Sequence, residues 1–267
     1  MGLGASRPAA LQPPNQCADA RHRAGAILFV THVCYVTEHG VCMSLLARFS
    51  SARADDPPIA GTAREGWPYI LGLAAVAVPL WRWRPLAGFV VLTLAAGVAA
   101  FFRDPVRRLV ADPDLLYAPA DGTVMGVDTV DDPWYVQQPS HRISIFLSVL
   151  DVHVNRSPVE GEVVITRELG TGFAPAMNFA ASHGNRRREI GMSTARGPIL
   201  VVQVAGLLAR RIVGWVQAGE QVSAGQKLGM ITFGSRTDLI IPLGAGQPTV
   251  TVGQKVAGGI TPIARWT

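Results

Sequence analysis

Hydrophobic positions along the chain form two different patterns, one before and one after residue 112. Before it, two apolar runs at 66–81 and 86–102 contain almost no polar residues and are separated by the basic sequence RWRP. A helix needs ~17–25 apolar residues to span a bilayer, so each run is at the lower limit. The pattern predicts a membrane-associated hydrophobic helical hairpin within 64–108; a helical hairpin buried in a soluble core is the alternative.

After residue 112, short runs of Val, Ile and Leu alternate with Gly, Pro and Asp, as in RISIFLSVLDVHV and TVTVGQKV. Closely spaced apolar runs with turn residues between them are typical of β-strands. We therefore expect a mainly β (α+β) fold, in which the helical hairpin precedes a β-rich, sandwich- or barrel-like domain at 112–267. The segments GWVQAGEQVSAGQKLG and TVTVGQKVAGG resemble the glycine turns of lipoyl-like barrels, but no lysine marks a swinging-arm carrier.

The first 60 residues show neither pattern. Ala, Pro and Arg are frequent there, so residues 1–60 are predicted to be a poorly structured extension, and translation from Met43 is a further hypothesis. All three cysteines, Cys17, Cys34 and Cys42, lie in this segment. The β-rich domain therefore needs neither a disulfide nor a thiolate metal site, and no metal is expected.

Composition and charge favour a protein that binds a membrane. Hydrophobic residues make up 49% of the chain and charged residues 16%, with a net charge of +5, whereas soluble proteins carry about 25% charged residues. A basic surface suits anionic lipid or nucleic acid, and no nucleic-acid-binding motif is present. Aromatic residues flank the first apolar run, where they favour the membrane interface. We expect the protein to bind membrane lipid and no nucleic acid.

The sequence FGSRTD at 233–238 is the first candidate for chemistry. Strand-like runs at 228–233 and 239–242 would hold Ser235 in a tight bend, and Gly234 has no side chain to hinder attack on its carbonyl group. This arrangement suits an acyl shift from nitrogen to the Ser235 hydroxyl, followed by an elimination that leaves a pyruvoyl group. A lone Gly-Ser pair is more often an ordinary turn, and the hydroxyl needs a neighbouring base.

Two residues qualify as that base. Asp121 stands before glycine in PADGTV, where a simple turn residue is the alternative. His153 stands in DVHVN, where a core histidine is the alternative. Only His141 and His183 accompany it after residue 40, so the choice of a histidine base is narrow.

Three motifs follow an apolar hairpin that ends in FFRDP: PADGTV, FLSVLDVHVNRSPVEG and FGSRTDLIIP. In this order they resemble the short bacterial and archaeal form of the phosphatidylserine decarboxylase family, over about residues 64–267. The resemblance implies a relay of Asp121, His153 and Ser235. Longer members of the family carry two histidines three residues apart; here His153 matches the first, tied to decarboxylation, and Arg156 stands at the second position. Two possibilities remain for the base: His153 serves both self-cleavage and decarboxylation, or Asp121 acts together with water.

The resemblance also implies self-cleavage between Gly234 and Ser235, giving a β chain (1–234) and an α chain (235–267) that remain together. Ser235 then becomes a covalent pyruvoyl cofactor, with neither pyridoxal phosphate nor metal. The implied enzyme is a carboxy-lyase of phospholipid biosynthesis: phosphatidylserine forms a Schiff base with the pyruvoyl group, CO2 leaves, and phosphatidylethanolamine is released. The implied location is the cytoplasmic face of the cell membrane.

Two other functions fit the same sequence features. In the first alternative, the protein is a decarboxylase whose substrate is a related serine-headed lipid, such as archaetidylserine. In the second, the protein is a non-catalytic, membrane-tethered lipoyl-like barrel. Self-cleavage separates the enzyme from the scaffold.

A basic segment at 173–189, FAPAMNFAASHGNRRRE, is the last candidate. The resemblance places substrate binding near here, and His183, Asn185 and Arg186 are the residues we expect to take part. Its arginines would contact the phosphodiester or anionic headgroups of lipid. A solvated basic loop is the alternative.

Overall fold

The computed structural model describes residues 34–36, 42–44, 61–131, 134–179, 181–207, 211–232 and 235–267. Contacts divide the chain into two compact units, Met1–Leu45 and Leu46–Thr267. In the first unit, strands β1 (Cys34–Val36) and β2 (Cys42–Ser44) pair in antiparallel fashion. The rest of the extension predicted at 1–60 lies outside the described residues.

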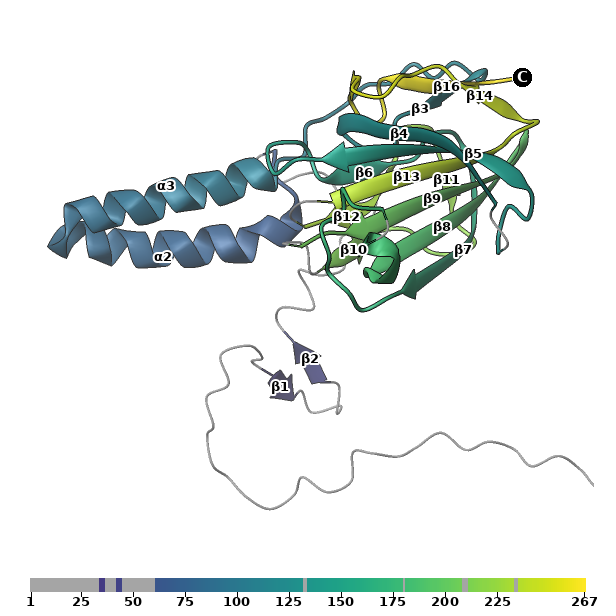
Figure 1. Ribbon diagram of the computed structural model, residues 1–267. Helices are drawn as coiled ribbons and strands as arrows, with labels where there is room; N and C mark the ends of the chain where they lie inside the picture. Colours follow the sequence, from purple (N-terminus) through teal and green to yellow (C-terminus); the bar gives the residue numbers. More distant parts are fainter. Residues whose placement is uncertain are drawn as a thin grey trace, which may run out of the picture. The chain divides into compact units, whose positions relative to one another are not determined.

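The second unit is mainly β-sheet, which confirms the mainly β part of the predicted fold (Figure 1). Its described strands are β3 (Leu115–Tyr117), β4 (Gly122–Asp131), β5 (Pro139–Leu147), β6 (Val154–Arg156), β7 (Gly161–Leu169), β8 (Arg187–Thr194), β9 (Gly197–Ala205), β10 (Ile212–Gly214), β11 (Gln221–Val222), β12 (Lys227–Ile231), β13 (Ser235–Pro242), β14 (Gly246–Pro248), β15 (Lys255–Val256) and β16 (Pro262–Trp266). They form a large sheet, β11-β7-β8-β9-β13-β5-β4-β15, and two small ones, β10-β12-β6 and β14-β16-β3. Strand β13 therefore lies inside the large sheet, between β9 and β5.

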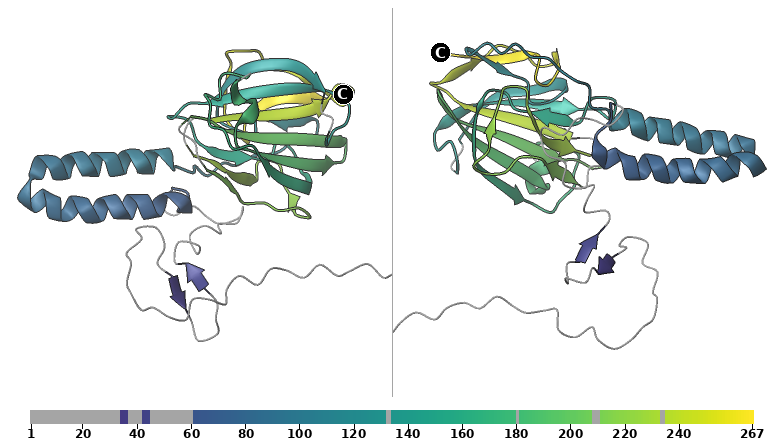
Figure 2. Two further views of the ribbon diagram at one scale, coloured as in Figure 1. Left: turned by 60° about the horizontal axis from the view of Figure 1, so that its bottom comes forward. Right: turned by 180° about the vertical axis from the view of Figure 1, so that it is seen from behind.

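Two helices precede these sheets in the chain. The short 3-10 turn η1 (Arg64–Gly66) leads into α2 (Trp67–Trp83), and α3 (Pro85–Phe101) follows after a single residue. The helices lie side by side (Figures 1 and 2), and Gly88 permits their close approach because a Cβ there would lie 2.7 Å from Trp81 Cα. No helix among the described residues is long and apolar enough to cross a membrane.

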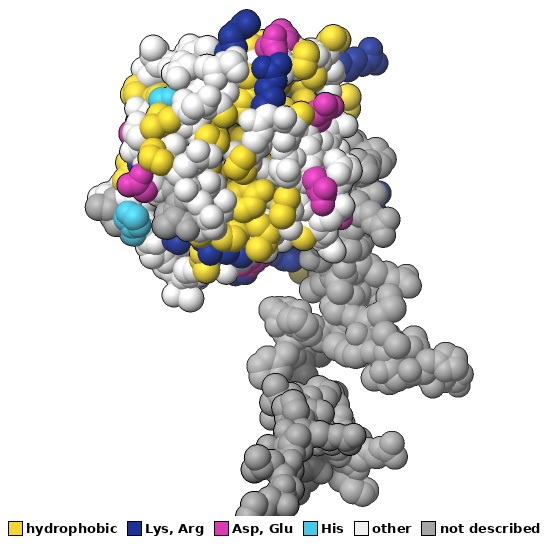
Figure 3. Space-filling model, turned by 90° about the vertical axis from the view of Figure 1, so that its right-hand side faces the viewer, with side chains coloured by type: hydrophobic (Ala, Val, Ile, Leu, Met, Phe, Trp, Pro, Cys, Tyr) yellow, Lys and Arg dark blue, Asp and Glu magenta, His cyan; other side chains and the backbone are white. Residues whose placement is uncertain are grey.

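Large apolar side chains cover much of the outside of both helices. The exposed ones are Tyr69, Leu71, Val76, Val78, Trp81 and Trp83 on α2, and Leu86, Phe89, Val90, Leu92 and Leu94 on α3. The side of the β-sheets seen in Figure 3 instead mixes hydrophobic side chains with charged and uncharged polar ones. A dense apolar surface of the kind found on the helices marks an interaction site.

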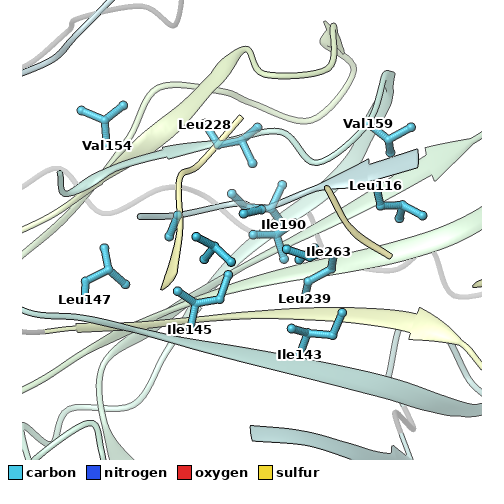
Figure 4. Close-up of a cluster of buried hydrophobic side chains, with 14 of the residues drawn as sticks. Leu116, Ile143, Ile145, Leu147, Val154, Val159, Ile190, Leu228, Leu239 and Ile263 are labelled. Carbon is cyan, nitrogen blue, oxygen red and sulfur yellow. The ribbon is translucent and has the colours of Figure 1, made fainter. Parts of the chain in front are cut away.

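The hydrophobic core lies where the three sheets face one another. Figure 4 shows Leu239 and Ile145 of the large sheet, Leu228 of β12, and Leu116 and Ile263 of the third sheet within one cluster. All five side chains are fully buried. Burial of each contributes about 1.5–3 kcal/mol relative to exposure, so this cluster fixes the sheets against one another.

Buried polar contacts hold the corner where the helices meet the sheets. The carboxylate of Asp104, three residues after α3, is paired with Arg156 at 3.2 Å and with Lys227 at 2.6 Å. Just before α2, Glu65 accepts a hydrogen bond of 2.7 Å from Trp215 Nε1. The helices are thus attached at one end of the sheets, beside β6 and β12.

Candidate functional site

Ser235 is the first residue of β13 and lies inside the large sheet. Its backbone pairs with Leu147 of β5 on one side and Ala205 of β9 on the other. The sequence predicts a strand only from Leu239; β13 begins four residues earlier because pairing on both sides buries its polar start. Ser235 is fully buried, and its Oγ has no hydrogen-bond partner. Gly234, the other predicted cleavage residue, lies outside the described residues.

His153 immediately precedes β6 and is also fully buried. Its Nδ1 lies 2.9 Å from the carbonyl oxygen of Asp151, an acceptor, so Nδ1 carries the hydrogen and Nε2 holds a free lone pair. Nε2 has no hydrogen-bond partner. The ring of Phe101, the last residue of α3, covers the imidazole with centroids 4.3 Å apart. Burial lowers the pKa of His153 to about 4, against the opposing effect of the Asp151 carbonyl. The imidazole is therefore neutral near pH 7.

Strand geometry places His153 and Ser235 at the same end of two facing layers. Asn155 Nδ2 of β6 donates to Thr237 Oγ1 of β13 across the layers at 2.9 Å. Side chains two residues apart on a strand share a face, so Ser235 lies on the same face as Thr237. His153 lies two residues before Asn155, and its carbonyl accepts a hydrogen bond from Ile231 N at the end of β12. The chain therefore brings a buried base and a buried hydroxyl into one region.

Asp121 directly precedes β4 and makes a set of contacts different from the implied relay. Its two carboxylate oxygens accept hydrogen bonds from Arg107 at 2.6 and 2.7 Å, and one also accepts from Gly258 N at 2.7 Å. No hydrogen bond between described residues joins Asp121 to His153, although the Asp121 charge acts to raise the pKa of that histidine. Asp121 is thus an electrostatic neighbour of His153 whose own oxygens are already bonded.

Arg156, at the position of the second family histidine, is a structural residue in the described contacts. It is buried, pairs with Asp104, and donates to the carbonyl groups of Gly225 and Pro105 at 3.1 Å each. These bonds tie β6 to the corner after α3. His153 is left as the histidine of this motif in the site.

Asn185 is one of the three residues predicted to bind substrate, and its side chain is fully used within the protein. Its Nδ2 donates to the carbonyl groups of Ala174 and Ala205 at 2.7 Å, and its Oδ1 accepts from Ala174 N at 2.8 Å. Ala205 is the β9 partner of Ser235. Asn185 therefore holds the preceding loop against the strand end next to Ser235.

The other two predicted substrate-binding residues lie near the surface. His183 is exposed, and Arg186 forms an exposed ion pair of 2.9 Å with Glu168. The following arginines do not continue the basic loop expected from the sequence, because β8 (Arg187–Thr194) pairs with β7 and β9. This pairing turns Arg188 to the core, where only 6% of it is exposed.

Two further residues of the site were missed by sequence reasoning. Thr237 and Gln203 are fully buried on the inner face of the large sheet, and Gln203 Nε2 donates to Asn155 Oδ1 at 2.8 Å. Gln203 is the lone polar residue of the apolar run PILVVQVAG, which was the available signal. The sequence of a single strand does not show that Thr237 and Gln203 of the large sheet both contact Asn155 of β6 in the facing sheet.

The arrangement of Ser235 and His153 suits a nucleophilic serine. Ser235 Oγ has no structural hydrogen bond to lose, and the neutral His153 supplies a lone pair at the same end of the fold. Among the described residues, no group of three or more His, Cys, Asp or Glu side chains forms a metal site. An acyl shift onto the serine hydroxyl is the chemistry these residues support.

Comparison with known proteins agrees with the motifs. The family model described as phosphatidylserine decarboxylase matches residues 94–264. The chain is 42% identical over 202 residues to a phosphatidylserine decarboxylase proenzyme of Carboxydothermus hydrogenoformans, covering 76% of this chain and 95% of the relative. It is 43% identical over 204 residues to that of Symbiobacterium thermophilum (76% and 94%) and 41% over 210 residues to that of Ralstonia pickettii (76% and 94%). The resemblance seen in the sequence is confirmed: the chain belongs to the phosphatidylserine decarboxylase family.

Proposed function

We propose that this protein decarboxylates phosphatidylserine to phosphatidylethanolamine, using a pyruvoyl group that it makes by cutting itself between Gly234 and Ser235. The buried, unpartnered Ser235 Oγ at the start of an internal strand is the observation that carries the proposal. Family membership supports it, and the relatives are named proenzymes. A hydroxyl that is destroyed by elimination must have no structural role, and Ser235 meets this condition.

The cleavage begins when Ser235 Oγ attacks the carbonyl carbon of Gly234 and the peptide nitrogen leaves, giving an ester. Neutral His153 Nε2 takes the hydroxyl proton and passes it to the departing nitrogen. Asp121 is the weaker candidate for this base because Arg107 and Gly258 already occupy its oxygens. Elimination then releases the Gly234 carboxylate, and water converts the remaining dehydroalanine into a pyruvoyl group with loss of ammonia.

In the decarboxylation, the pyruvoyl group supplies a ketone that binds the substrate amine and withdraws electrons as CO2 leaves. The amine must lose a proton before it reacts, and His153 is in the neutral form that accepts one. The resulting imidazolium returns a proton to the carbon that has lost its carboxylate. A single imidazole thereby serves both reactions, which agrees with Arg156 being engaged elsewhere.

Lipid reaches this site at the membrane surface. The exposed apolar side chains of α2 and α3 suit the lipid phase, and the exposed arginines at 82, 84 and 108 suit anionic headgroups. Phe101 at the end of α3 contacts His153, so the lipid-facing helices end beside the catalytic histidine. Attachment to the cytoplasmic face of the cell membrane is part of the proposal.

Mass spectrometry of the purified protein tests the self-cleavage. We expect two fragments, with a pyruvoyl group in place of Ser235 at the start of the smaller one. Ser235→Ala should remain one chain and lose decarboxylation completely, because neither the shift nor the ketone is possible. The matched control Ser193→Ala, at an exposed serine of β8, should be cleaved and active. Activity from an uncut chain with ordinary serine at 235 would overturn the proposal.

A further inference from the structure

A row of polar side chains crosses the inner face of the large sheet next to Ser235. Arg188 of β8 is in register with Gln203 of β9, and Gln203 is in register with Thr237 of β13. Thr237 lies two residues after Ser235 on the same face. Polar side chains at such buried positions need hydrogen-bond partners, and two atoms of this row have none.

Arg188 is a buried cation that forms no ion pair with a described residue. Only 6% of the residue is exposed, and no carboxylate among the described residues lies within ion-pair distance of it. Nη2 donates to the carbonyl of Val216 at 2.5 Å, while Nη1 has no partner. Burial lowers the pKa of Arg188, as expected for a charge removed from water, and the charges of Glu168 and Glu220 oppose this effect only in part. A buried charge without a direct partner is unfavourable, so an anion bound at Arg188 would complete the site.

The fold keeps space for this guanidinium. A Cβ at Gly214 of β10 would lie 1.3 Å from Arg188 Nη1, so only glycine fits there. A cavity of about 180 Å³ adjoins Arg188 and is lined also by Gly214, Thr166, Arg167 and Glu168. The carboxylate of Glu168 is already paired with another arginine at 2.9 Å. Glu168 and Glu220 therefore act on Arg188 only from beyond ion-pair distance, and neither neutralises it by direct contact.

Gln203 presents an acceptor whose orientation is fixed by its neighbours. Asn155 Nδ2 donates to the carbonyl of Pro119 at 3.3 Å and to Thr237 Oγ1 at 2.9 Å, so Asn155 Oδ1 must accept. The atom facing Asn155 Oδ1 is therefore Gln203 Nε2, at 2.8 Å. Gln203 Oε1 is left buried and unpartnered. A ligand that donates N–H groups would satisfy it.

We infer that Arg188 and Gln203 form a headgroup subsite, in which Arg188 binds the phosphodiester of the lipid and Gln203 accepts a hydrogen bond from its amino nitrogen. The inference rests on the proposed function and names the residues that recognise its substrate. The ligand must accept a hydrogen bond from Arg188 Nη1 and donate one to Gln203 Oε1. An aminophospholipid can do both, because its phosphodiester accepts and its amino group donates. The lipid carries two anionic groups, the phosphodiester and the carboxylate that leaves as CO2. A cation beside that carboxylate would stabilise the substrate more than the transition state and so slow the reaction. Arg188 is therefore assigned to the phosphodiester.

Equilibrium binding of soluble headgroups tests the subsite directly, with mature enzyme whose ketone has first been reduced by borohydride so that no amine can form a Schiff base with it. Glycerophosphoethanolamine carries the phosphodiester and the amine, glycerophosphoglycerol lacks the amine, and inorganic phosphate lacks both the diester and the amine. For wild type we expect calorimetry to give the tightest binding for glycerophosphoethanolamine, at least tenfold tighter than for inorganic phosphate. Arg188→Met should weaken both diesters at least tenfold. Gln203→Met should remove the preference for the amine and leave glycerophosphoglycerol unchanged.

Matched controls separate recognition from general damage. Arg196→Met removes an exposed arginine paired with Asp114, and Gln221→Met removes an exposed glutamine bonded to Glu162; both should bind like wild type. Self-cleavage should persist in Arg188→Met and Gln203→Met, and the KM for phosphatidylserine should rise at least tenfold in Arg188→Met with less change in kcat. A lower thermal midpoint with unchanged headgroup binding would show a structural role and overturn the inference.

The outcomes also distinguish this inference from the proposed function. Wild-type enzyme that decarboxylates phosphatidylserine, together with wild-type headgroup binding in Arg188→Met, would remove the subsite and leave the function intact. Wild-type protein that binds glycerophosphoethanolamine through Arg188 but releases no CO2 from phosphatidylserine would support the subsite and overturn the function. Binding of inorganic phosphate as tight as that of the diesters would point to a free-phosphate site and overturn the headgroup assignment.

Discussion

At the scale of single residues, buried polar atoms divide into those with partners and those without. Asn185 uses both side-chain atoms in bonds to the backbone, and Asp121 uses both of its oxygens. Ser235 Oγ and His153 Nε2 use none. A buried polar atom without a partner destabilises a fold by about 1–3 kcal/mol, so the unpartnered atoms are the ones whose presence must be explained by chemistry.

The pH dependence of stability follows from His153. Its folded pKa is about 4, below the ordinary 6.5, so the unfolded chain binds the proton more tightly. Stability from the neutral imidazole is fully present above pH 6.5 and is lost as the pH falls toward 4, by roughly 3 kcal/mol. Chemical unfolding at several pH values should show this slope in wild type and a shallower one in His153→Gln. The exposed His183→Gln is the control and should keep the wild-type slope.

At the scale of elements, the end of α3 is part of the site. Phe101 is buried against His153, and Phe102 packs edge-on against Phe101 with centroids 5.1 Å apart. The side chain of Arg103 then donates to the carbonyl of Leu150, in the loop that carries His153. The helical hairpin and the histidine loop therefore cannot move independently at this corner.

Removal of the Phe101 ring should change the titration of His153. In Phe101→Ala, water reaches one face of the imidazole, so the pKa of His153 should rise from about 4 toward its ordinary value. NMR titration of labelled histidine rings measures this, with the resonance assigned through His153→Gln. Phe89→Ala removes an exposed ring of the same helix and should leave the titration unchanged. An unaltered His153 titration in Phe101→Ala would show that the ring does not control it.

The corner after α3 depends on Asp104. Asp104→Asn removes the buried negative charge that pairs with Arg156 and Lys227, so the free energy of unfolding should fall by about 3 kcal/mol or more. Denaturant titration of the intact precursor, in a Ser235→Ala background, measures it without the complication of a cut chain. Asp128→Asn breaks a more exposed pair with Arg142 and should change stability by less than about 1 kcal/mol. Equal effects of the two substitutions would contradict the assignment of the corner to Asp104.

At the scale of the whole molecule, more than half of the large exposed apolar side chains in the described part of the chain lie on the helical hairpin. The hairpin carries eleven large exposed apolar side chains between Tyr69 and Leu94, while the face in Figure 3 shows mixed character. Its arginines lie at the two ends of the helices. This distribution suits insertion of the apolar hairpin into lipid, with its arginines at anionic headgroups.

Vesicle flotation should report this attachment. We expect wild type to float with phosphatidylglycerol-containing vesicles, and the triple variant Leu86→Ser, Phe89→Ser, Val90→Ser to stay at the bottom of the gradient while still cleaving itself. These side chains are exposed, so their loss removes lipid contact without opening the core. Val252→Ser, at an exposed position near β14, is the control and should float. Flotation of the triple variant would show that another surface binds the membrane.

Much of this architecture was predictable from the sequence, and the failures have physical causes. The short apolar runs indicated the strands, and the two long ones lie at the positions of α2 and α3. Local patterns did not predict that β13 starts at Ser235, because its polar first half is buried through pairing with two distant strands. The bonds of Asp121 to Arg107, and of Asn155 to Thr237, join residues far apart in the chain and leave no mark in local spacing.

The internal position of β13 decides what a break before Ser235 does to the molecule. The released fragment would still be stitched into the large sheet along β5 and β9, and its later strands β14 and β16 form most of the third sheet. The two pieces would stay interlocked in a non-covalent heterodimer, and separation would require melting of the core. After unfolding, the two fragments would have to associate again in solution. The peptide bond between Gly234 and Ser235, whose cleavage would generate the pyruvoyl group, would no longer exist. The protein would therefore assemble its chemistry once, and denaturation of the mature form would be a one-way event.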